Sequence, residues 1–321
     1  MHNQRLNYLK VCLNYNCNFN CLFCCSPFKE RLLSKENILN IDEMSKLIDG
    51  FTRLGIEHIR IVGGEPLLRE DIFDFIYMIS STKRLKQISL TTNGFYLKDK
   101  ALALKGAGLN RLNISLSSLD EEKFKKITGF DGLARVMEGI CAAKEAELSP
   151  IRINVVLYKG LNSDEIEDFA ALSVLYPLDV RFIEYFPNSQ SITNFRSVYV
   201  PGYVVKNNIE FAFGSLISDK TDPCEGPATY YRIKDARGRI GFINSVTEFF
   251  CVDCNTLMLL EDGKLFPCLY SSGYIDLRES LRNYEFKLLL DKMQDCFKIK
   301  PHINRNITVK NLEEYSPYIE Y

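Results

Sequence analysis

Three cysteines with short spacings follow the first apolar stretch of the chain. They are Cys17, Cys21 and Cys24, and they come just after a predicted strand over residues 8–13. Iron–sulfur clusters are held by cysteine thiolates, and a [4Fe–4S] cluster contains four irons. Three local thiolates therefore bind three irons and leave the fourth open to another ligand. The spacing predicts a cluster whose open iron is the place of reaction.

A structural zinc site, or a group of buried thiols, is the alternative for these three cysteines. Structural zinc sites have four ligands, usually in two close pairs. The three cysteines are one ligand short of such a shell, and no histidine follows nearby. The cluster is the favoured interpretation.

A second group of three cysteines lies late in the chain. Cys251 and Cys254 are followed by Cys268, and the turn-like residues 261–264 predict a hairpin that brings Cys268 back to the pair. A zinc ribbon with Cys224 as fourth ligand fits this spacing equally well. The presence of two such groups in one chain favours two clusters.

Strand-like and helix-like segments alternate through the first half of the chain. This alternation predicts an α/β fold with parallel strands and right-handed crossovers. A partial (β/α)6 barrel of the TIM type is expected, with a doubly wound sheet as the competing arrangement. The expected strands are residues 8–13, 58–62, 87–91, 111–116, 151–157 and 179–185, and the expected helices are 42–54, 71–81, 98–107, 133–146 and 163–175.

Unusual residues fall where these strands end. Gly63, Gly64 and Glu65 follow the second strand, residues 91–94 end the third, and Ser115 lies near the end of the fourth. Binding groups of such folds sit at the carboxyl ends of the strands. We therefore expect these residues to share one rim with the first cysteines.

Each of these motifs also has an ordinary structural interpretation. The two glycines can form a tight turn that needs positive φ, or they can let the backbone approach a ligand, with Glu65 accepting from a cation. Arg60 and Arg152 lie within strands, where they can face outward or reach an anionic ligand inside the barrel.

The regular alternation stops at about residue 187. Prolines and glycines punctuate residues 187–229, as expected of a linker or a segment that covers a substrate. Short strands at 228–233, 239–243 and 257–260 predict a small β-rich module. We expect two domains, a barrel over residues 1–190 and a C-terminal module over residues 191–321 with the second cluster.

Composition excludes several classes of partner. The 321 residues carry a formal net charge of −1, with 46% hydrophobic and 25% charged residues, so neither a nucleic-acid nor a membrane partner is expected. No apolar run reaches the roughly 20 residues of a membrane span, and the N-terminus has no signal-like region. A cytoplasmic location is expected, where thiols stay reduced, so eleven cysteines indicate metal or redox chemistry more readily than disulfides.

Together these motifs resemble the radical S-adenosylmethionine (radical SAM) enzymes, and among them the molybdenum-cofactor biosynthesis protein A family of GTP 3′,8-cyclases. The resemblance covers about residues 5–275. Besides both cysteine groups it includes residues 63–66, 111–120, 151–159, 181–184, 226–228 and 241–243.

The resemblance implies two [4Fe–4S] clusters and S-adenosylmethionine as cofactors. Cys17, Cys21 and Cys24 would bind the first cluster, and Cys251, Cys254 and Cys268 the second. One electron from the first cluster would cleave S-adenosylmethionine to a 5′-deoxyadenosyl radical, which in the family takes the 3′-hydrogen of GTP before C3′ joins C8. Contacts to S-adenosylmethionine would come from Phe23, Gly63, Gly64, Glu65, Ser115 and Phe186.

Substrate contacts implied by the resemblance are Lys10, Arg60, Thr91 and Arg152. Lys10 stands where the family has arginine, and two further arginines of the family fall at Thr256 and Met258. The family's C-terminal Gly-Gly is replaced by residues 318–321, and Cys25 replaces a methionine. These differences keep a second hypothesis open, a diverged relative that modifies another nucleotide or a peptide. A zinc-binding interaction protein without catalysis is the third.

Partners expected from the resemblance are a small-molecule substrate, a nucleotide, and a one-electron reductant of the flavodoxin or ferredoxin type. A second copy of the chain, in a homodimer, is also considered.

Overall fold

A single open sheet forms the frame of the protein. The computed structural model describes residues 6–24, 34–186, 195–219, 226–248, 254–268 and 273–299. The sheet order is β12-β11-β10-β1-β2-β3-β4-β5-β6-β9-β8-β7, and the run from β10 to β9 is parallel throughout. The strands are β1 Tyr8–Cys12, β2 His58–Val62, β3 Gln87–Thr92, β4 Arg111–Ser115, β5 Ile151–Val156, β6 Leu178–Ile183, β7 Ile217–Asp219, β8 Thr229–Arg232, β9 Ile240–Ile243, β10 Thr256–Leu259, β11 Lys264–Phe266 and β12 Ile275–Asp276.

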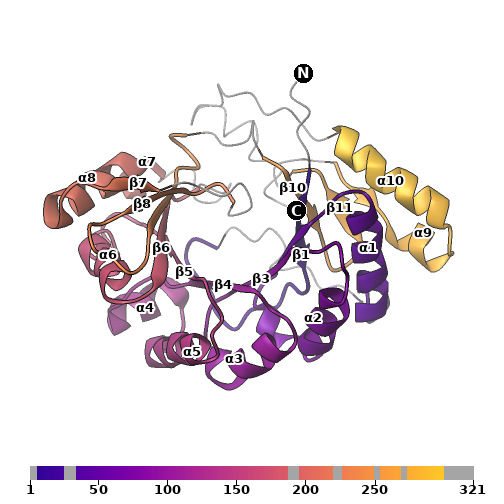
Figure 1. Cartoon of the computed structure of the whole chain (residues 1–321), viewed down its shortest axis with the longest axis horizontal. Coiled ribbons are helices and arrows are strands. Elements are labelled where there is room, and N and C mark those ends of the chain that lie inside the picture. Colours follow the sequence, from indigo (N-terminus) through magenta and orange to yellow (C-terminus); the bar gives the residue numbers. More distant parts are fainter. Residues whose placement is uncertain are drawn as a thin grey trace.

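Helices cover the outer face of this curved sheet (Figure 1). The sheet is curved and its two ends do not join, so the expected partial barrel is confirmed. The concave side of the sheet is called the lumen below. The helices are α1 Ile41–Arg53, α2 Ile72–Ser80, α3 Leu97–Gly106, α4 Glu121–Thr128, α5 Leu133–Glu145, α6 Ile166–Leu175, α7 Phe195–Val198, α8 Gly202–Phe213, α9 Arg278–Arg282 and α10 Phe286–Ile299, with short 3-10 turns η1 Lys35–Asn37 and η2 Pro66–Leu68.

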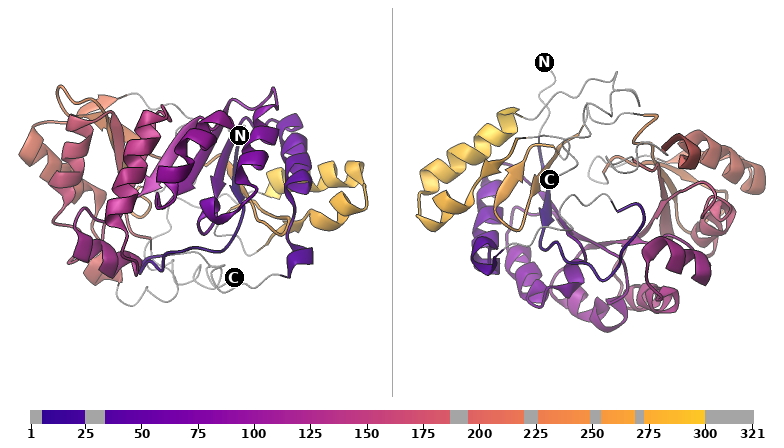
Figure 2. Two further views of the ribbon diagram at one scale, coloured as in Figure 1. Left: turned by 90° about the horizontal axis from the view of Figure 1, so that it is seen from below. Right: turned by 180° about the vertical axis from the view of Figure 1, so that it is seen from behind.

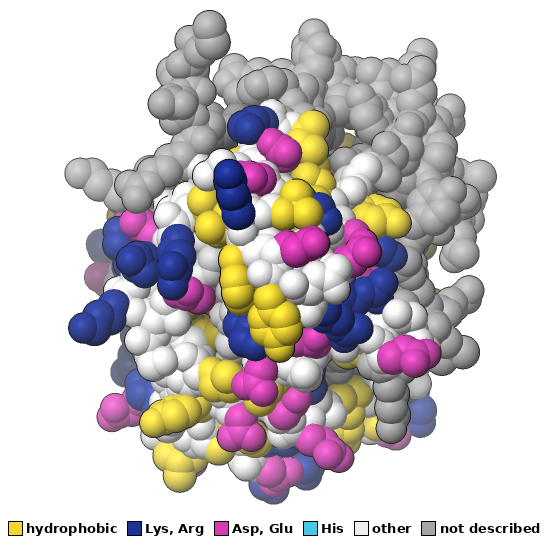
Figure 3. Space-filling model, turned by 90° about the vertical axis from the view of Figure 1, so that its right-hand side faces the viewer, with side chains coloured by type: hydrophobic (Ala, Val, Ile, Leu, Met, Phe, Trp, Pro, Cys, Tyr) yellow, Lys and Arg dark blue, Asp and Glu magenta, His cyan; other side chains and the backbone are white. Residues whose placement is uncertain are grey.

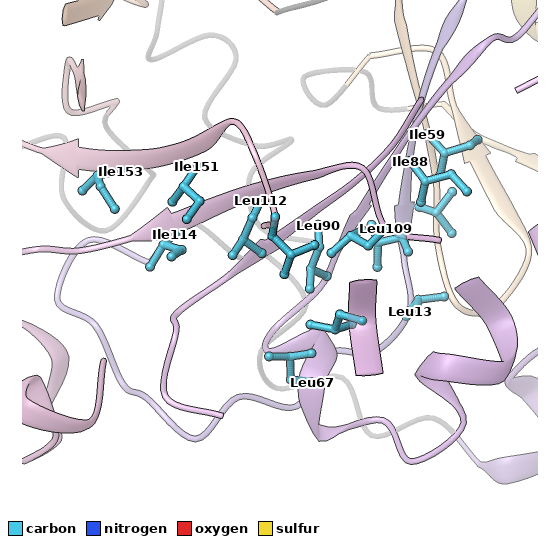
Figure 4. Packing of buried hydrophobic residues seen from close by; sticks show 14 of the residues in the cluster. Leu13, Ile59, Leu67, Ile88, Leu90, Leu109, Leu112, Ile114, Ile151 and Ile153 are labelled. Atoms are coloured by element: carbon cyan, nitrogen blue, oxygen red, sulfur yellow. The ribbon is translucent and has the colours of Figure 1, made fainter. Parts of the chain in front are cut away.

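Each barrel strand divides its side chains between two environments. Successive strand residues point to opposite faces, and one set, including Leu9, Ile59, Leu90, Leu112 and Ile153, is buried in the hydrophobic core. Figure 4 shows members of this core packed together. The alternate set is polar and faces the lumen, from Tyr8 and Lys10 of β1 to Arg181 of β6. The lumen side of the strands is therefore mainly polar, and the side under the helices is apolar.

Strands from the C-terminal part continue the barrel at both ends. β9 pairs in parallel with β6, and β10 pairs in parallel with β1. The antiparallel strands β8, β7, β11 and β12 then extend the two edges. The expected short strands are present, but they belong to the same sheet as the barrel. The division of the chain at residue 190 remains a prediction.

Several local expectations were wrong. The segment after residue 194 is not only a linker, because α8 begins at Gly202 with Pro201 as its cap residue. The expected helices also left out α4, whose cap is Asp120. Helix α1 begins at Ile41, one residue before the expected start, after a capping box between Asn40 and Glu43.

The face that carries α9 and α10 bears a mixture of basic, acidic and hydrophobic side chains (Figure 3). The two helices lie beside α1, far along the chain from it (Figures 1 and 2). A bidentate contact of Arg282 with Glu43 joins α9 to α1, at 2.7 and 3.3 Å. No helix in the described part of the chain is long and apolar enough to cross a membrane.

Candidate active site

The loop that carries the first cysteines is held in place by neighbouring elements. The N–H groups of Asn20 and Leu22 donate to the carbonyls of Thr128 and Ile127, at 2.8 and 2.9 Å. Phe19 is buried against the rings of Phe95, Phe124 and Phe130. Anchoring of the residues between the cysteines leaves Cys17 and Cys24 exposed and Cys21 half-buried.

Within the described ranges, no three His, Cys, Asp or Glu side chains lie close enough to hold one metal ion.

Gly63 and Gly64 allow the loop after β2 to touch the cysteine loop. A Cβ on Gly64 would lie 2.2 Å from the carbonyl oxygen of Asn16 and 2.4 Å from that of Tyr15. Hydrogen bonds join the two loops, from Gly64 N to Asn14 O at 2.8 Å and from Glu65 N to Asn16 O at 2.7 Å. Neither glycine has a positive φ, so close approach, and not turn geometry, requires glycine here.

Glu65 differs from the expectation of an acceptor for a cation. Its carboxylate is fully buried and accepts hydrogen bonds from Thr92 Oγ1 at 2.7 Å, Asn93 N at 2.7 Å and Leu67 N at 3.0 Å. Burial raises the pKa of this carboxyl, while the hydrogen bonds and the charge of Lys100 oppose the shift. Glu65 thus holds the end of β3 against the loop after β2.

The other expected rim residues also lie at the carboxyl ends of the strands. Ser115 is the last residue of β4 and is exposed, while Thr91 near the end of β3 is half-buried. Phe23 in the cysteine loop and Phe186 just beyond β6 are half-buried. The structure places the first cysteine group and these residues at one edge of the barrel.

The second cysteine group lies at the opposite edge. Cys254 precedes β10 and Cys268 follows β11, and these strands form the expected antiparallel hairpin through Leu260 and Lys264. Because β10 is parallel to β1, the residues before β10 lie at the amino ends of the barrel strands. Both thiols are half-buried, and Cys251 lies outside the described residues. A five-residue strand such as β1 separates the two edges by about 16 Å.

Cationic side chains line the lumen between the two edges. Lys10 and Arg60 occupy paired positions on β1 and β2. Arg152 on β5 is fully buried, and its Nε lies 3.7 Å from Asp179, which binds Arg239 more closely at 2.6 Å. Asp179 is thus shared by two arginines. Positive side chains are thus gathered on the lumen side of β1, β2 and β5.

Arg181, on β6, is a lumen residue that the sequence motifs did not assign to binding. It donates to Asn154 Oδ1 at 2.8 Å and to Asn113 Oδ1 at 2.6 Å. Burial lowers the pKa of this guanidinium to about 10, and the charges of Arg60 and Arg152 act in the same direction. Tyr230 opposes this shift, while Arg60 and Arg152 each disfavour the charged form of Arg181. The polar alternation along β6 was the signal that could have identified Arg181.

Thr256 and Met258 lie on the same wall as Lys10. The register pairs Tyr8 with Thr256 and Lys10 with Met258. Gly226, from the segment before β8, approaches Arg60, with 3.5 Å between a Cβ built on the glycine and Arg60 Nη2. The wall nearest the second cysteine group is therefore neutral at Thr256 and Met258.

Comparison with known proteins explains this combination of features. Residues 11–173 match the Radical SAM superfamily, and residues 178–305 match Molybdenum Cofactor Synthesis C. The chain is 38% identical to a GTP 3′,8-cyclase of Alkaliphilus oremlandii over 90% of its own length and 88% of that protein. It is 40% identical to that of Peptoclostridium acidaminophilum, over 88% and 86%.

The chain belongs to the radical SAM superfamily, in the family of the GTP 3′,8-cyclases.

Solved structures share the radical SAM fold at low sequence identity. Streptococcus suis SuiB bound to S-adenosylmethionine has a TM-score of 0.58 and 15% identity, covering 90% of this chain and 64% of SuiB. Native anSMEcpe with bound AdoMet has a TM-score of 0.54 and 15% identity, covering 97% of this chain and 96% of that one. The chain thus spans under two thirds of SuiB and nearly all of anSMEcpe.

Family membership makes the protein an enzyme that uses S-adenosylmethionine and two [4Fe–4S] clusters. The residues at the carboxyl edge fit these cofactors. They combine exposed thiols with a backbone whose glycines permit close approach. The described cysteines at the amino edge, Cys254 and Cys268, are half-buried and flank one hairpin.

Proposed function

We propose that the protein is a GTP 3′,8-cyclase of molybdenum cofactor biosynthesis. The observation that supports this proposal is a group of cationic side chains on the lumen side of the strands, between the two cysteine groups. They are Lys10, Arg60, Arg152 and Arg181. Opposite charges attract more strongly inside a protein than in water, so several cationic side chains gathered on one side of the sheet favour a polyanionic ligand. The name of the curated relatives, GTP 3′,8-cyclase, gives the specific substrate.

Cofactor binding at the carboxyl edge is assigned to residues of the loops described above. Cys17, Cys21 and Cys24 hold the first cluster, and Phe23, Gly63, Gly64, Ser115 and Phe186 contact S-adenosylmethionine, with Glu65 holding the loops together. When bound, the first cluster and S-adenosylmethionine supply a 5′-deoxyadenosyl radical that removes hydrogen from the substrate. The chain's part is to place the substrate and exclude water.

Substrate binding in the lumen is assigned to side chains from several strands. Lys10, Arg60 and Arg152 bind the phosphates, and Thr91 contributes a hydroxyl near the carboxyl edge. Asn113 and Asn154 hold the Arg181 side chain in place. Its positive charge therefore adds to the positive electrostatic potential of the lumen without a change of rotamer. Cys251, Cys254 and Cys268 hold the second cluster, which faces the base.

A different nucleoside triphosphate is the second candidate substrate. Thr256 and Met258 are neutral and lie on the strand that follows Cys254. These neutral side chains offer the substrate fewer charged donors than Lys10 and Arg60, which lie level with Met258 on β1 and β2. The phosphate-binding lumen stays the same for either nucleotide.

The remaining partners are proposals that follow from the family. A flavodoxin or ferredoxin type of protein supplies the electron, the location is cytoplasmic, and two copies of the chain form a homodimer.

Anaerobic turnover with a panel of nucleotides tests this function. Reconstituted protein should contain about eight irons, since each [4Fe–4S] cluster has four. With dithionite and S-adenosylmethionine, GTP should increase 5′-deoxyadenosine formation and be consumed, while ATP and guanosine should not. A larger response to another triphosphate would favour the second candidate. Iron-free protein that binds zinc would reject both.

A further inference from the structure

Asn93, just beyond β3, contacts the first of the cluster cysteines. Its side-chain Nδ2 lies 3.9 Å from Cys17 Sγ and 2.8 Å from Asn18 Oδ1. Cys17 Sγ also accepts from the backbone N–H of Phe19 at 3.4 Å. Asn93 therefore supplies the side-chain donor in this group, alongside a donor from the loop's own backbone.

The orientation of the Asn93 amide is fixed by its other partners. Its Oδ1 accepts from the backbone N–H of Phe95 at 3.1 Å, which leaves the NH₂ group to face Cys17. Its own backbone N–H donates to the buried carboxylate of Glu65 at 2.7 Å. Asn93 is 9% exposed, so water competes little for this amide. The donor is held toward the sulfur before any cofactor binds.

A hydrogen-bond donor that points at a thiolate ligand affects the reduction potential of the cluster. Hydrogen bonds to the sulfurs are among the factors that set the potential of an iron–sulfur cluster. Reduction adds negative charge to the cluster and its thiolates, and the positive end of an N–H dipole stabilises that charge. Groups behind the first ligands tune metal sites in the same way.

We propose that Asn93 is a positioning residue for the first cluster, and that its amide N–H raises the reduction potential of that cluster through Cys17. Glu65 and the Phe95 backbone hold the amide in place for this purpose. The inference rests on the proposed placement of the first cluster at Cys17, Cys21 and Cys24. It gives the sequence Thr91–Gly94 a role at the cluster in addition to substrate contact.

Two substitutions at Asn93 and one at Asn18 separate this role from loop stability. Asn93→Leu keeps the approximate volume and removes the donor. Asn93→Asp keeps the acceptor for Phe95 and replaces the donor with an oxygen. Asn18→Ala is the matched control, because it removes the competing acceptor Oδ1 and leaves the Asn93 donor for Cys17.

The measurement is an EPR-monitored redox titration of the fully loaded, full-length protein without S-adenosylmethionine. Two waves are expected, one for each cluster. In both Asn93 variants one wave should move to lower potential, farther for Asn93→Asp, while the other wave stays in place as an internal reference. Asn18→Ala should leave that wave unchanged or move it upward.

The proposal would be overturned if neither Asn93 variant changed the reduction potential of a cluster. It would also be overturned if Asn18→Ala lowered the potential as much as the Asn93 variants do. If Asn93→Leu fails to load iron, Asn93→Asp decides by the same criterion. Placement of the cluster is tested separately, because Cys24→Ala should remove one wave and about half of the iron. Retention of both waves in Cys24→Ala would reject the placement, a result distinct from unmoved potentials.

Discussion

The carboxylate of Glu184 accepts a hydrogen bond from the backbone N–H of Val246 at 2.7 Å. The same carboxylate accepts from Thr247 N and Oγ1, at 2.9 and 2.6 Å, and from Gly202 N at 2.9 Å. One buried side chain at the end of β6 therefore joins the start of α8 to the segment after β9, which leads to Cys251 and Cys254.

Glu184→Gln should destabilise the protein, because an amide nitrogen cannot accept from the N–H groups that now share two carboxylate oxygens. Hydrogen bonds to charged groups contribute about 1.5–3 kcal/mol each, so we expect a loss of at least about 2 kcal/mol. Urea unfolding of the iron-free protein measures it. Glu121→Gln, an exposed position on α4, is the control and should unfold like the wild type.

Gly64→Ala should disrupt the carboxyl edge, since its Cβ would meet carbonyl oxygens of Tyr15 and Asn16 at under 2.5 Å. The cysteine loop must move, and we expect S-adenosylmethionine affinity to fall about 10-fold or more, the equivalent of 1.4 kcal/mol. Gly106→Ala is the matched control, because a Cβ there meets no atom within 4 Å. Calorimetric titration of both variants with S-adenosylmethionine compares them, and equal affinities would contradict the close-approach role.

Replacing a cationic side chain of the lumen should weaken the binding of nucleotides. The effect should grow with the number of phosphate groups that the nucleotide carries. Arg60→Met and Arg152→Met should each raise the Kd for GTP about 10- to 100-fold, from about 1.5–3 kcal/mol per charged hydrogen bond. Asp179 keeps its close partner Arg239 in Arg152→Met, so no buried carboxylate loses its only cation. Guanosine affinity should change little. Arg53→Met, whose guanidinium lies exposed on α1, should change neither affinity.

Glu261 should make stability depend on pH. Burial raises the pKa of this carboxyl to about 7, with the charge of Arg69 opposing and that of Asp262 adding to the shift. Between its ordinary value of 4.5 and about 7 the folded protein binds more protons than the unfolded chain. Stability contributed by this group therefore falls as pH rises through that window.

Glu261→Gln should remove this dependence and raise the stability of iron-free protein at pH 7.5 by about 1–3 kcal/mol relative to wild type, since one pKa unit corresponds to about 1.4 kcal/mol. Urea unfolding between pH 5 and pH 8 measures the effect. An unchanged slope in the variant would assign the pH dependence to other groups.

The barrel could be predicted from sequence because its strands have a regular pattern. Apolar and polar residues alternate along β2 and β5, and β2 was predicted with its observed bounds, His58–Val62. Helix α8 was missed because Pro201 and Gly202, which begin it, are also residues of loops. The pairing of β10 with β1 depends on residues far apart in sequence, and no local pattern encodes it.

Part of the site could likewise be predicted, and part could not. The spacing of Cys17, Cys21 and Cys24 and the pair Gly63–Gly64 are local signals, and the structure brings these residues to one edge. The alternation along β6 marks Arg181 and Asp179, but their contacts with Asn113, Asn154, Arg152 and Arg239 become visible only when the strands lie side by side. The burial of Glu65 also depends on its contact with Thr92 and Asn93, which the sequence separates from it.

Deuterium transfer from the substrate most directly tests the central claim, that a nucleotide in the cationic lumen gives up a ribose hydrogen to a radical from S-adenosylmethionine. The protein is incubated with dithionite, S-adenosylmethionine and GTP deuterated at C3′, and the mass of 5′-deoxyadenosine is measured. We predict 5′-deoxyadenosine that carries one deuterium and forms together with GTP consumption. Unlabelled 5′-deoxyadenosine, formed at the same rate with and without GTP, would contradict the account.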